Sequence, residues 1–264
     1  MQTNNLFTIQ RLMMLCKQSY IINKKLIAIS IAGFSGILFL ILLGNQSGAD
    51  FSNWQSRNYL GTFVPLFFIL GIIYSGLSFP AFRSKEKSMA YLMLPATASE
   101  KFIFELVTRI VVFILLMPLL FWVIANIEGT VVHYFVPRLR NYTFSFGMVF
   151  SEISNPAKFD FWAKLAIIQG VLFVFISTFT GASHFAKSPL LKTIFTFSLL
   201  AAGYGLFILL LMKGLRLDGI HVDNNGVFFI KNKDDLQAFF AVAITAINLT
   251  LLSVAWFSLK EKEA

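Results

Sequence analysis

The residues of this sequence that could carry chemistry are few, and their spacing does not form an active site. The three histidines, His133, His184 and His221, lie far apart, and none has a partner at a metal-ligand spacing such as H-E-x-x-H. The sequence contains no G-x-x-x-x-G-K-[ST] motif for binding a nucleotide. The single cysteine, Cys16, excludes an intrachain disulfide and a thiolate cluster. We therefore expect no enzymatic activity, no metal and no cofactor in this chain itself.

One loop combines charged and apolar residues in a way that predicts docking. Its sequence is FRSKEKSMAYLMLPATASEKF, from residue 82 to residue 102. Residues 85–93 fit a short helix that ends before Pro95, and Thr97 with Glu100 matches the capping box of a following helix. Water disfavours such apolar side chains, so the loop either lies on the membrane or docks into a cytoplasmic partner. The docking residues would be Lys85, Met89, Tyr91, Leu92, Met93, Leu94, Pro95, Thr97, Glu100 and Lys101.

The N-terminal segment has the pattern of an amphipathic helix. Leu6, Ile9, Met13, Cys16 and Tyr20 recur at three- and four-residue spacing, with polar residues on most of the remaining circumference. Such a helix lies in the interface between membrane and cytoplasm. It is either an ordinary anchor or a fixed elbow that leads into the first membrane crossing, and the spacing does not separate the two.

Two other segments carry weaker signals. Asn225-Gly226 stands between two short β-prone runs, which predicts a small extracytoplasmic β-hairpin. Asp223 and Asn224 precede this turn without the spacing of a calcium loop, so the turn explains them better than a cation site does. Residues 128–164 are rich in Phe and Tyr, which favours an aromatic belt at the level of the lipid headgroups.

The composition indicates that most of the chain is surrounded by membrane lipid and not by water. Of the 264 residues, 57% are hydrophobic and only 13% are charged, whereas a soluble domain keeps about a quarter of its residues charged. The net charge of +9 comes from residues scattered through the loops, without a basic stripe among stacking aromatics. We therefore expect anionic membrane lipid, and not nucleic acid, to balance this charge.

The sequence predicts an all-α integral membrane protein of one domain with six membrane-spanning helices. A helix needs about 20 apolar residues to cross the hydrocarbon core. Pro65 and Pro118 would kink two of these helices, and Glu105 and Arg109 lie one turn apart and can pair. The expected crossings are residues 26–48, 59–81, 102–127, 163–184, 191–212 and 237–258.

The interiors of these crossings lack a charged relay. They contain Gln169 and Asn248 but no Asp, Glu, Lys or Arg at midplane depth. A carrier driven by protons or ions normally keeps an ionisable residue there. If the protein performs work, the energy must come from another molecule.

The basic residues predict the orientation. With the N-terminus inside, the inner segments hold 13 of the 22 Lys and Arg residues, and the bias is sharpest around the first crossing. An even number of crossings then places both termini in the cytoplasm. We expect a multi-pass protein of the bacterial cell (inner) membrane.

The arrangement resembles the permease subunit of ABC-2-type ABC transporters, and the run LPATASEKF is similar to runs in such permeases of Bacteroidetes. In that family an amphipathic elbow helix precedes six crossings, and a coupling helix lies between the second and third. The resemblance implies a separate cytoplasmic ABC ATPase, a homodimer or heterodimer of permeases, and export of a substrate that the sequence does not identify. The uncharged, aromatic-rich crossings would suit an amphiphilic substrate. An ATPase groove would then receive Met89, Tyr91, Leu92, Met93 and Leu94.

A second function fits the same docking loop. The chain could be a membrane anchor or scaffold that recruits a cytoplasmic complex and transports nothing. A P-loop ATPase encoded by a neighbouring gene would favour the permease, and its absence would favour the anchor.

Overall fold

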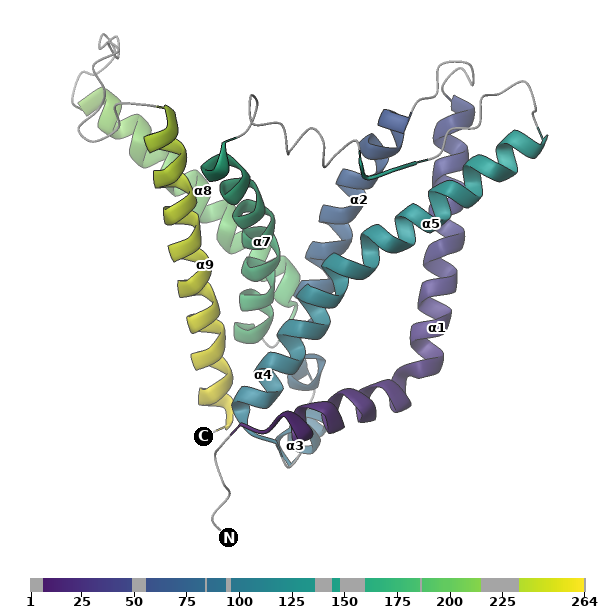
Figure 1. Cartoon of the computed structure of the whole chain (residues 1–264). Coiled ribbons are helices and arrows are strands. Elements are labelled where there is room, and N and C mark those ends of the chain that lie inside the picture. Colours follow the sequence, from purple (N-terminus) through teal and green to yellow (C-terminus); the bar gives the residue numbers. More distant parts are fainter. Residues whose placement is uncertain are drawn as a thin grey trace. The chain divides into compact units, whose positions relative to one another are not determined.

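The computed structural model describes residues 7–48, 56–83, 85–93, 96–135, 144–147, 160–185, 187–214 and 233–263. These residues are almost entirely helical and include no strand. Among them, five helices are long and apolar enough to cross a bilayer. The protein is therefore an all-α, multi-pass membrane protein, as the composition predicts (Figure 1).

The five candidate crossings are Ile9–Gln46, Asn58–Gly76, Ala98–Phe135, Phe161–His184 and Gln237–Lys262. The elements are α1 (Ile9–Gly48), α2 (Ser56–Gly76), the 3-10 helix η2 (Pro80–Arg83), α3 (Lys85–Leu92), α4 (Ala98–Leu106), the π-helix η3 (Val107–Val111), α5 (Val112–Phe135), α7 (Phe161–His184), α8 (Pro189–Gly214) and α9 (Lys233–Glu263).

The chain divides into two compact units. One consists of Met1–Tyr74 and Leu94–Glu152, and the other of Ser75–Met93 and Ile153–Ala264. We call them the first and the second unit. The first contains α1, most of α2, α4, η3 and α5, and the second contains the end of α2, η2, α3, α7, α8 and α9.

The core of the first unit joins α1, α2 and α5 through large apolar side chains. Its buried members are Leu38, Leu42, Tyr59, Phe121, Ile124, Ala125 and Phe144. Phe121 and Phe144 meet edge-to-face with their ring centroids 5.3 Å apart, a favourable geometry for two aromatic rings. Asn126 fixes the segment that carries Phe144, because its side-chain amide donates to the Phe144 carbonyl at 3.1 Å and accepts from the Phe144 N–H at 3.2 Å.

The core of the second unit is built around the carboxyl-terminal half of α7. Every residue from Phe175 to Ser183 in the sequence FISTFTGAS is buried. Small side chains allow helices to approach closely, and their hydroxyl groups bond across the contact. The Thr180 hydroxyl donates to the Leu251 carbonyl of α9 at 3.1 Å, and Thr178 pairs with Ser75 at the end of α2 at 2.5 Å. α7 therefore contacts α9 and α8, which lie beside it in Figure 1, and it bonds to the end of α2.

A polar pair joins α7 and α9 within the crossings. The Asn248 amide donates to Gln169 Oε1 at 2.8 Å and to the Gln169 carbonyl at 3.1 Å, and Asn248 is only 4% exposed. Sequence analysis found both residues but gave no reason to expect them to meet. Their contact fixes the register of α7 against α9.

We expect Asn248→Leu to destabilise the protein by about 0.6–1.7 kcal/mol, since interhelical hydrogen bonds in membranes contribute about this much. Unfolding of the purified protein by SDS in mild detergent measures the change. Gln169→Leu and the double variant complete a double-mutant cycle. If the two single effects simply add, Asn248 and Gln169 are not coupled and this account of the pair is wrong.

Three predicted boundaries differ from the structure. The second crossing ends at Gly76, not at residue 81, because Pro80 disfavours helical backbone at Phe79, which adopts a left-handed φ of 54°. The third runs as Ala98–Phe135 and not as 102–127, because Glu128 is buried inside the helix instead of starting a loop. The first is continuous with the N-terminal segment, since no Gly or Pro interrupts residues 9–32.

Other predictions lie partly or wholly outside the described residues. The β-hairpin around Asn225-Gly226 and His221 lie outside them, as does most of the predicted aromatic belt. The fifth predicted crossing, residues 191–212, falls within α8, whose described apolar part, Pro189–Leu200, is shorter than a crossing. It therefore stays a prediction. Pro65 and Pro118 do lie inside α2 and α5, as expected.

Candidate functional site

The short helix predicted in the docking loop is present as α3, and it exposes two methionines. Met89 is 63% exposed and Met93 is 84% exposed. The Met93 N–H donates to the Met89 carbonyl at 3.0 Å, so the two side chains lie one helical turn apart on the same face. We call Met89 and Met93 the methionine face. Methionine is flexible and polarizable, and it is common on surfaces that bind other proteins.

The other face of α3 packs against η2, within the second unit. The Ser88 hydroxyl donates to the Ala81 carbonyl at 3.0 Å, and the Tyr91 ring meets the Phe82 ring edge-to-face at 5.5 Å. Phe82 in turn lies under the ammonium group of Lys262, 4.9 Å from its ring centroid, at the end of α9. These contacts join α3 to η2, and through η2 to α9.

A buried aromatic residue continues this contact into α7. Phe79 is 2% exposed, and its ring centroid lies 5.1 Å from that of Phe179. The Phe82 N–H donates to the Phe79 carbonyl at 3.1 Å. Lys262 also donates to the Ser183 carbonyl at 2.5 Å, which satisfies a carbonyl in the last turn of α7. A displacement of α3 would therefore act on both α7 and α9.

The second part of the docking loop belongs to the first unit. Thr97 is the N-cap of α4, and the predicted capping box is confirmed: Glu100 N–H donates to Thr97 Oγ1 at 3.4 Å, and Thr97 N–H donates to Glu100 Oε2 at 2.9 Å. Glu100 is fully buried and Lys101 is 2% exposed. Both belong to the predicted docking residues, and the structure buries both side chains.

Glu100 also binds the start of α1. Its Oε1 accepts from the Thr8 N–H at 2.8 Å and from the Thr8 hydroxyl at 3.3 Å. One carboxylate thus satisfies backbone donors at the beginning of two helices, where such donors lack intrahelical partners. Thr8 lies within the predicted elbow segment, and no sequence pattern connects it to a residue 92 positions away.

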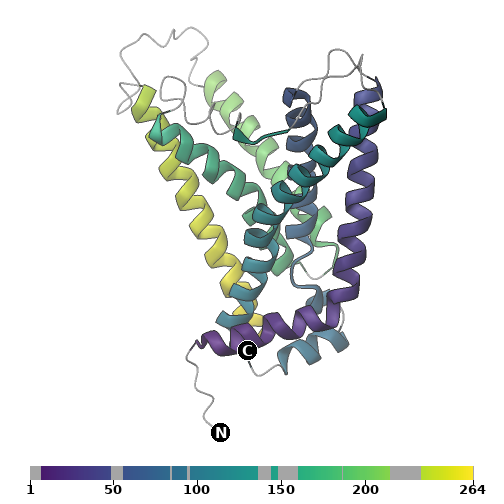
Figure 2. The ribbon, with the colours of Figure 1, turned by 45° about the vertical axis from the view of Figure 1, so that its right-hand side comes forward.

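The predicted apolar face of the N-terminal segment is not covered by the rest of the first unit. Ile9, Met13, Cys16 and Tyr20 are all exposed, and Leu6 lies outside the described residues. α1 contacts α4, and Leu12 and Leu15 are partly buried. In both views the α1 ribbon changes direction part way along its length (Figure 1 and Figure 2).

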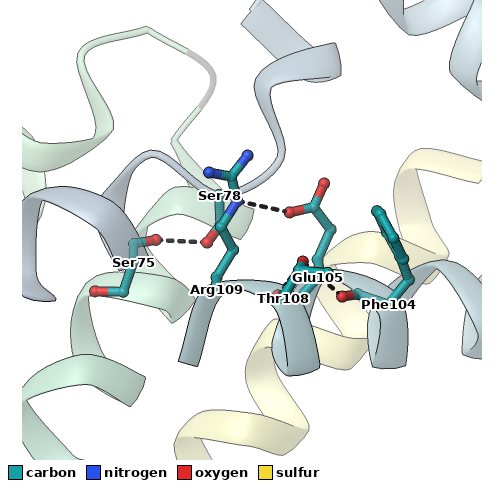
Figure 3. Close-up of polar contacts among 6 residues, drawn as sticks. All are labelled: Ser75, Ser78, Phe104, Glu105, Thr108 and Arg109. Carbon is teal, nitrogen blue, oxygen red and sulfur yellow. Dashed lines mark hydrogen bonds and ion pairs between the residues drawn. The ribbon is translucent and has the colours of Figure 1, made fainter. Parts of the chain in front are cut away.

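A predicted ion pair lies beyond α4, at a break in the regular helix. Arg109 Nε lies 3.3 Å from Glu105 Oε2, as the one-turn spacing predicts. The guanidinium group also lies 5.0 Å from the centroid of the Tyr74 ring. Figure 3 shows this pair, together with the Thr108 hydroxyl that donates to the Phe104 carbonyl at 2.7 Å. Val107–Val111 form a π-helix here, a widened turn that often occurs at functional positions.

The carboxyl-terminal end of α2 is capped by Ser78, which lies in the segment that follows this helix. The Ser78 hydroxyl donates to the Ser75 carbonyl at 2.6 Å, as Figure 3 also shows, and the Ser78 N–H donates to the same carbonyl at 3.1 Å. Both bonds satisfy a carbonyl at the helix terminus. The chain can therefore leave α2 and turn toward η2 and α3 without an unpaired buried carbonyl at Ser75.

The structure leaves several predicted site residues without a described position or side chain. Leu94 and Pro95 lie outside the described residues, and the side chains of Lys85 and Leu92 are likewise not described. Over the part of the chain that the structure describes, no group of three or more His, Cys, Asp or Glu side chains could hold a metal ion. Of the predicted docking residues, the exposed ones whose side chains the structure describes are Met89 and Met93, the methionine face of the second unit.

Sequence analysis missed one buried acidic residue. Glu128, assigned to a loop, lies inside α5 with no exposed surface, and its Oε2 accepts from the Tyr59 hydroxyl at 2.8 Å. The signal was present: Phe121, Ile124, Ala125, Glu128 and Val132 repeat at helical spacing and are all buried.

The chain was compared with models of known protein families, with curated proteins and with solved structures, and no match was found in any of the three comparisons.

Proposed function

We propose that this chain is the membrane-spanning permease subunit of an ATP-binding-cassette transporter, energised by a separate cytoplasmic ATPase. The observation that carries the proposal is the methionine face: Met89 and Met93 are 63% and 84% exposed on a short helix between two crossings. Exposed apolar side chains beside Glu86 and Lys87 are more consistent with a protein groove than with water.

The contacts of α3 support a mechanical role for this helix. A partner that binds Met89 and Met93 would push on α3, and the contacts of Tyr91 with Phe82 and of Phe82 with Lys262 lead from α3 to α9. Because packed side chains are densely arranged, such a displacement moves whole helices rather than single residues. The driving force would come from ATP hydrolysis in the partner, since the sequence itself has no P-loop.

Several finer features belong to the proposal. The region of α8 would provide the sixth crossing, and the beginning of α1 would be an elbow whose exposed face (Ile9, Met13, Cys16 and Tyr20) lies on the membrane surface. Both termini would be cytoplasmic, in a bacterial inner membrane. Two permeases, identical or different, would pair with two ATPases and export an amphiphilic substrate.

We expect the double variant Met89→Asp, Met93→Asp to bind the ATPase at least about a hundredfold more weakly than the wild type. Burying each methionine contributes about 1.5–3 kcal/mol, and each 1.4 kcal/mol corresponds to a factor of ten in affinity. The full-length protein is purified from its own membrane, the co-purifying P-loop ATPase is identified, and its affinity and ATP turnover are measured with both proteins in nanodiscs.

Met89→Leu, Met93→Leu is the matched control, because it keeps the apolar surface and the helix. It should retain association and turnover. Equal association and turnover in the Asp and Leu variants would contradict the proposal. Recruitment of a cytoplasmic protein without any ATP turnover would instead support the membrane anchor.

A further inference from the structure

The buried carboxyl group of Glu128 has a hydrogen-bonding arrangement that an ionised carboxylate does not explain. Glu128 lies on the core face of α5, one turn beyond Ile124 and Ala125, and has no exposed surface. Its Oε2 accepts a hydrogen bond from the Tyr59 hydroxyl at 2.8 Å. Its Oε1 is buried and has no hydrogen-bond partner among the described residues. A carboxylate with one neutral donor and no cation carries a large desolvation cost in such a core.

A second buried acceptor without a described donor lies on α1. Gln46 is 5% exposed, one turn beyond the core residue Leu42, and its Oε1 is also buried without a described partner. α1 and α5 pack together, and a buried acceptor oxygen that has no donor in such a core is satisfied by an added hydrogen or by a cation.

The charged groups whose side chains the structure describes do not supply that cation to Glu128. On α2 the titratable residues near Tyr59 include Arg57, whose side chain is not described, and on α5 they are His133 and Tyr134. His133 lies five residues along α5, which places it about 140° around the helix from Glu128. Residues 26–48 of α1 and residues 144–147 contain no Asp, Glu, Lys, Arg or His. Within the described part of the chain, Glu128 forms no ion pair.

We propose that Glu128 is a proton-binding site: its carboxyl group is a neutral acid in the folded protein, with the proton on Oε1 and with Oε2 accepting from Tyr59. The proton comes from water when the core closes over Glu128 and returns to water when the core opens, leaving a carboxylate. Glu128 lies seven residues from the end of α5, so the path to water at that end is about 10 Å.

The site goes beyond the transporter function and does not depend on it. It adds a bound proton to the core that α1, α2 and α5 share. Opening of that core would release one proton for each chain, whatever partner drives the opening. Glu100 and Glu105, the other buried carboxylates that the structure describes, have donors of their own from Thr8 and Thr97 and from Arg109, so neither requires a proton.

Infrared spectroscopy of the full-length protein in nanodiscs at about pH 7 tests the proposal directly, because a neutral carboxylic acid has a C=O band distinct from that of a carboxylate. We expect the wild type to show this band, Glu128→Gln to lack it, and the control Glu86→Gln, which changes an exposed carboxylate of α3, to retain it. Tyr59→Phe should keep the band and move it to higher frequency, since it removes the hydrogen bond to Oε2.

Proton release on unfolding is the second measurement. Glutamate is ionised in water at about pH 7, so the wild type should release one proton more than Glu128→Gln when it unfolds in weakly buffered solution. If Glu128→Gln does not fold, the test relies on the carboxylic-acid C=O band of the wild type and on its shift to higher frequency in Tyr59→Phe. Absence of the band from the folded wild type, or a stability that requires Na⁺ or K⁺ in the wild type but not in Glu128→Gln, would overturn the proposal.

Discussion

Replacing Gly181 with alanine is expected to destabilise the protein by about 1–3 kcal/mol, and so to lower the melting temperature by about 3–10 °C. A Cβ atom at this position would overlap Thr193 Oγ1 and lie 2.6 Å from both Thr193 Cβ and Thr193 Cγ2. No pair of carbon atoms packs at that distance, so α7 and α8 would have to separate or Thr193 would have to rotate.

Thr193 cannot rotate without cost. Its hydroxyl donates to the Pro189 carbonyl at 2.7 Å, and threonine is β-branched, which restricts χ1 in a helix. Thr193 is also 3% exposed, so a new rotamer would have to fit between packed side chains. The strain therefore falls on the contact between the two helices.

Two further glycines give a graded control. Gly170 lies on the same helix with nothing within 4 Å of its added Cβ, so Gly170→Ala should be neutral or stabilise the protein by up to about 1 kcal/mol. A Cβ at Gly76 would lie 2.6 Å from Leu190 Cδ2, a more flexible side chain, so Gly76→Ala should have an intermediate effect. Thermal unfolding in detergent measures all three. Equal melting temperatures for Gly170→Ala and Gly181→Ala would show that α7 and α8 do not pack as described.

Replacing Glu100 with alanine is expected to destabilise the first unit by about 2–4 kcal/mol. The substitution removes a capping box, worth about 0.5–2 kcal/mol, and a charged acceptor whose hydrogen bonds contribute about 1.5–3 kcal/mol. It leaves the N–H groups of Thr8 and Thr97 without their acceptor. The start of α1 and the start of α4 should therefore separate before the rest of the unit unfolds.

Amide hydrogen exchange locates this effect. The amides of Thr8 and Thr97 should exchange at least about tenfold faster in Glu100→Ala, since opening costs at least 1.4 kcal/mol less. Glu86→Ala is the control, because Glu86 lies exposed in the first turn of α3. Thr8→Val should have a smaller effect than Glu100→Ala, since it removes only the 3.3 Å hydroxyl bond and keeps the N–H donor. Unchanged exchange at both amides in Glu100→Ala would rule out the bond between the two helices.

The membrane fold was largely readable from the sequence because hydropathy acts locally. A run of about 20 uncharged residues must form a helix in lipid, whatever surrounds it, since each backbone group has to be satisfied within the segment. The capping box of Thr97 and Glu100 and the ion pair of Glu105 with Arg109 were predictable for the same reason, because their partners lie three and four residues apart. The helix of Met89 and Met93 is likewise a local pattern.

Only the tertiary structure decided which polar side chains are buried and which residues they bond to. In the sequence alone, Glu128 marks the end of a crossing; the structure shows that it is buried and accepts a hydrogen bond from Tyr59, 69 residues away. Glu100 is recognisable in the sequence as part of a helix cap, but its second bond, to Thr8, is visible only in the structure. Gly181 is one of 16 glycines in the sequence, and its importance comes from Thr193 on another helix. By itself the sequence determined where the chain meets lipid, because that depends on each segment alone. It did not determine the contacts between segments, because these depend on residues brought together from distant positions.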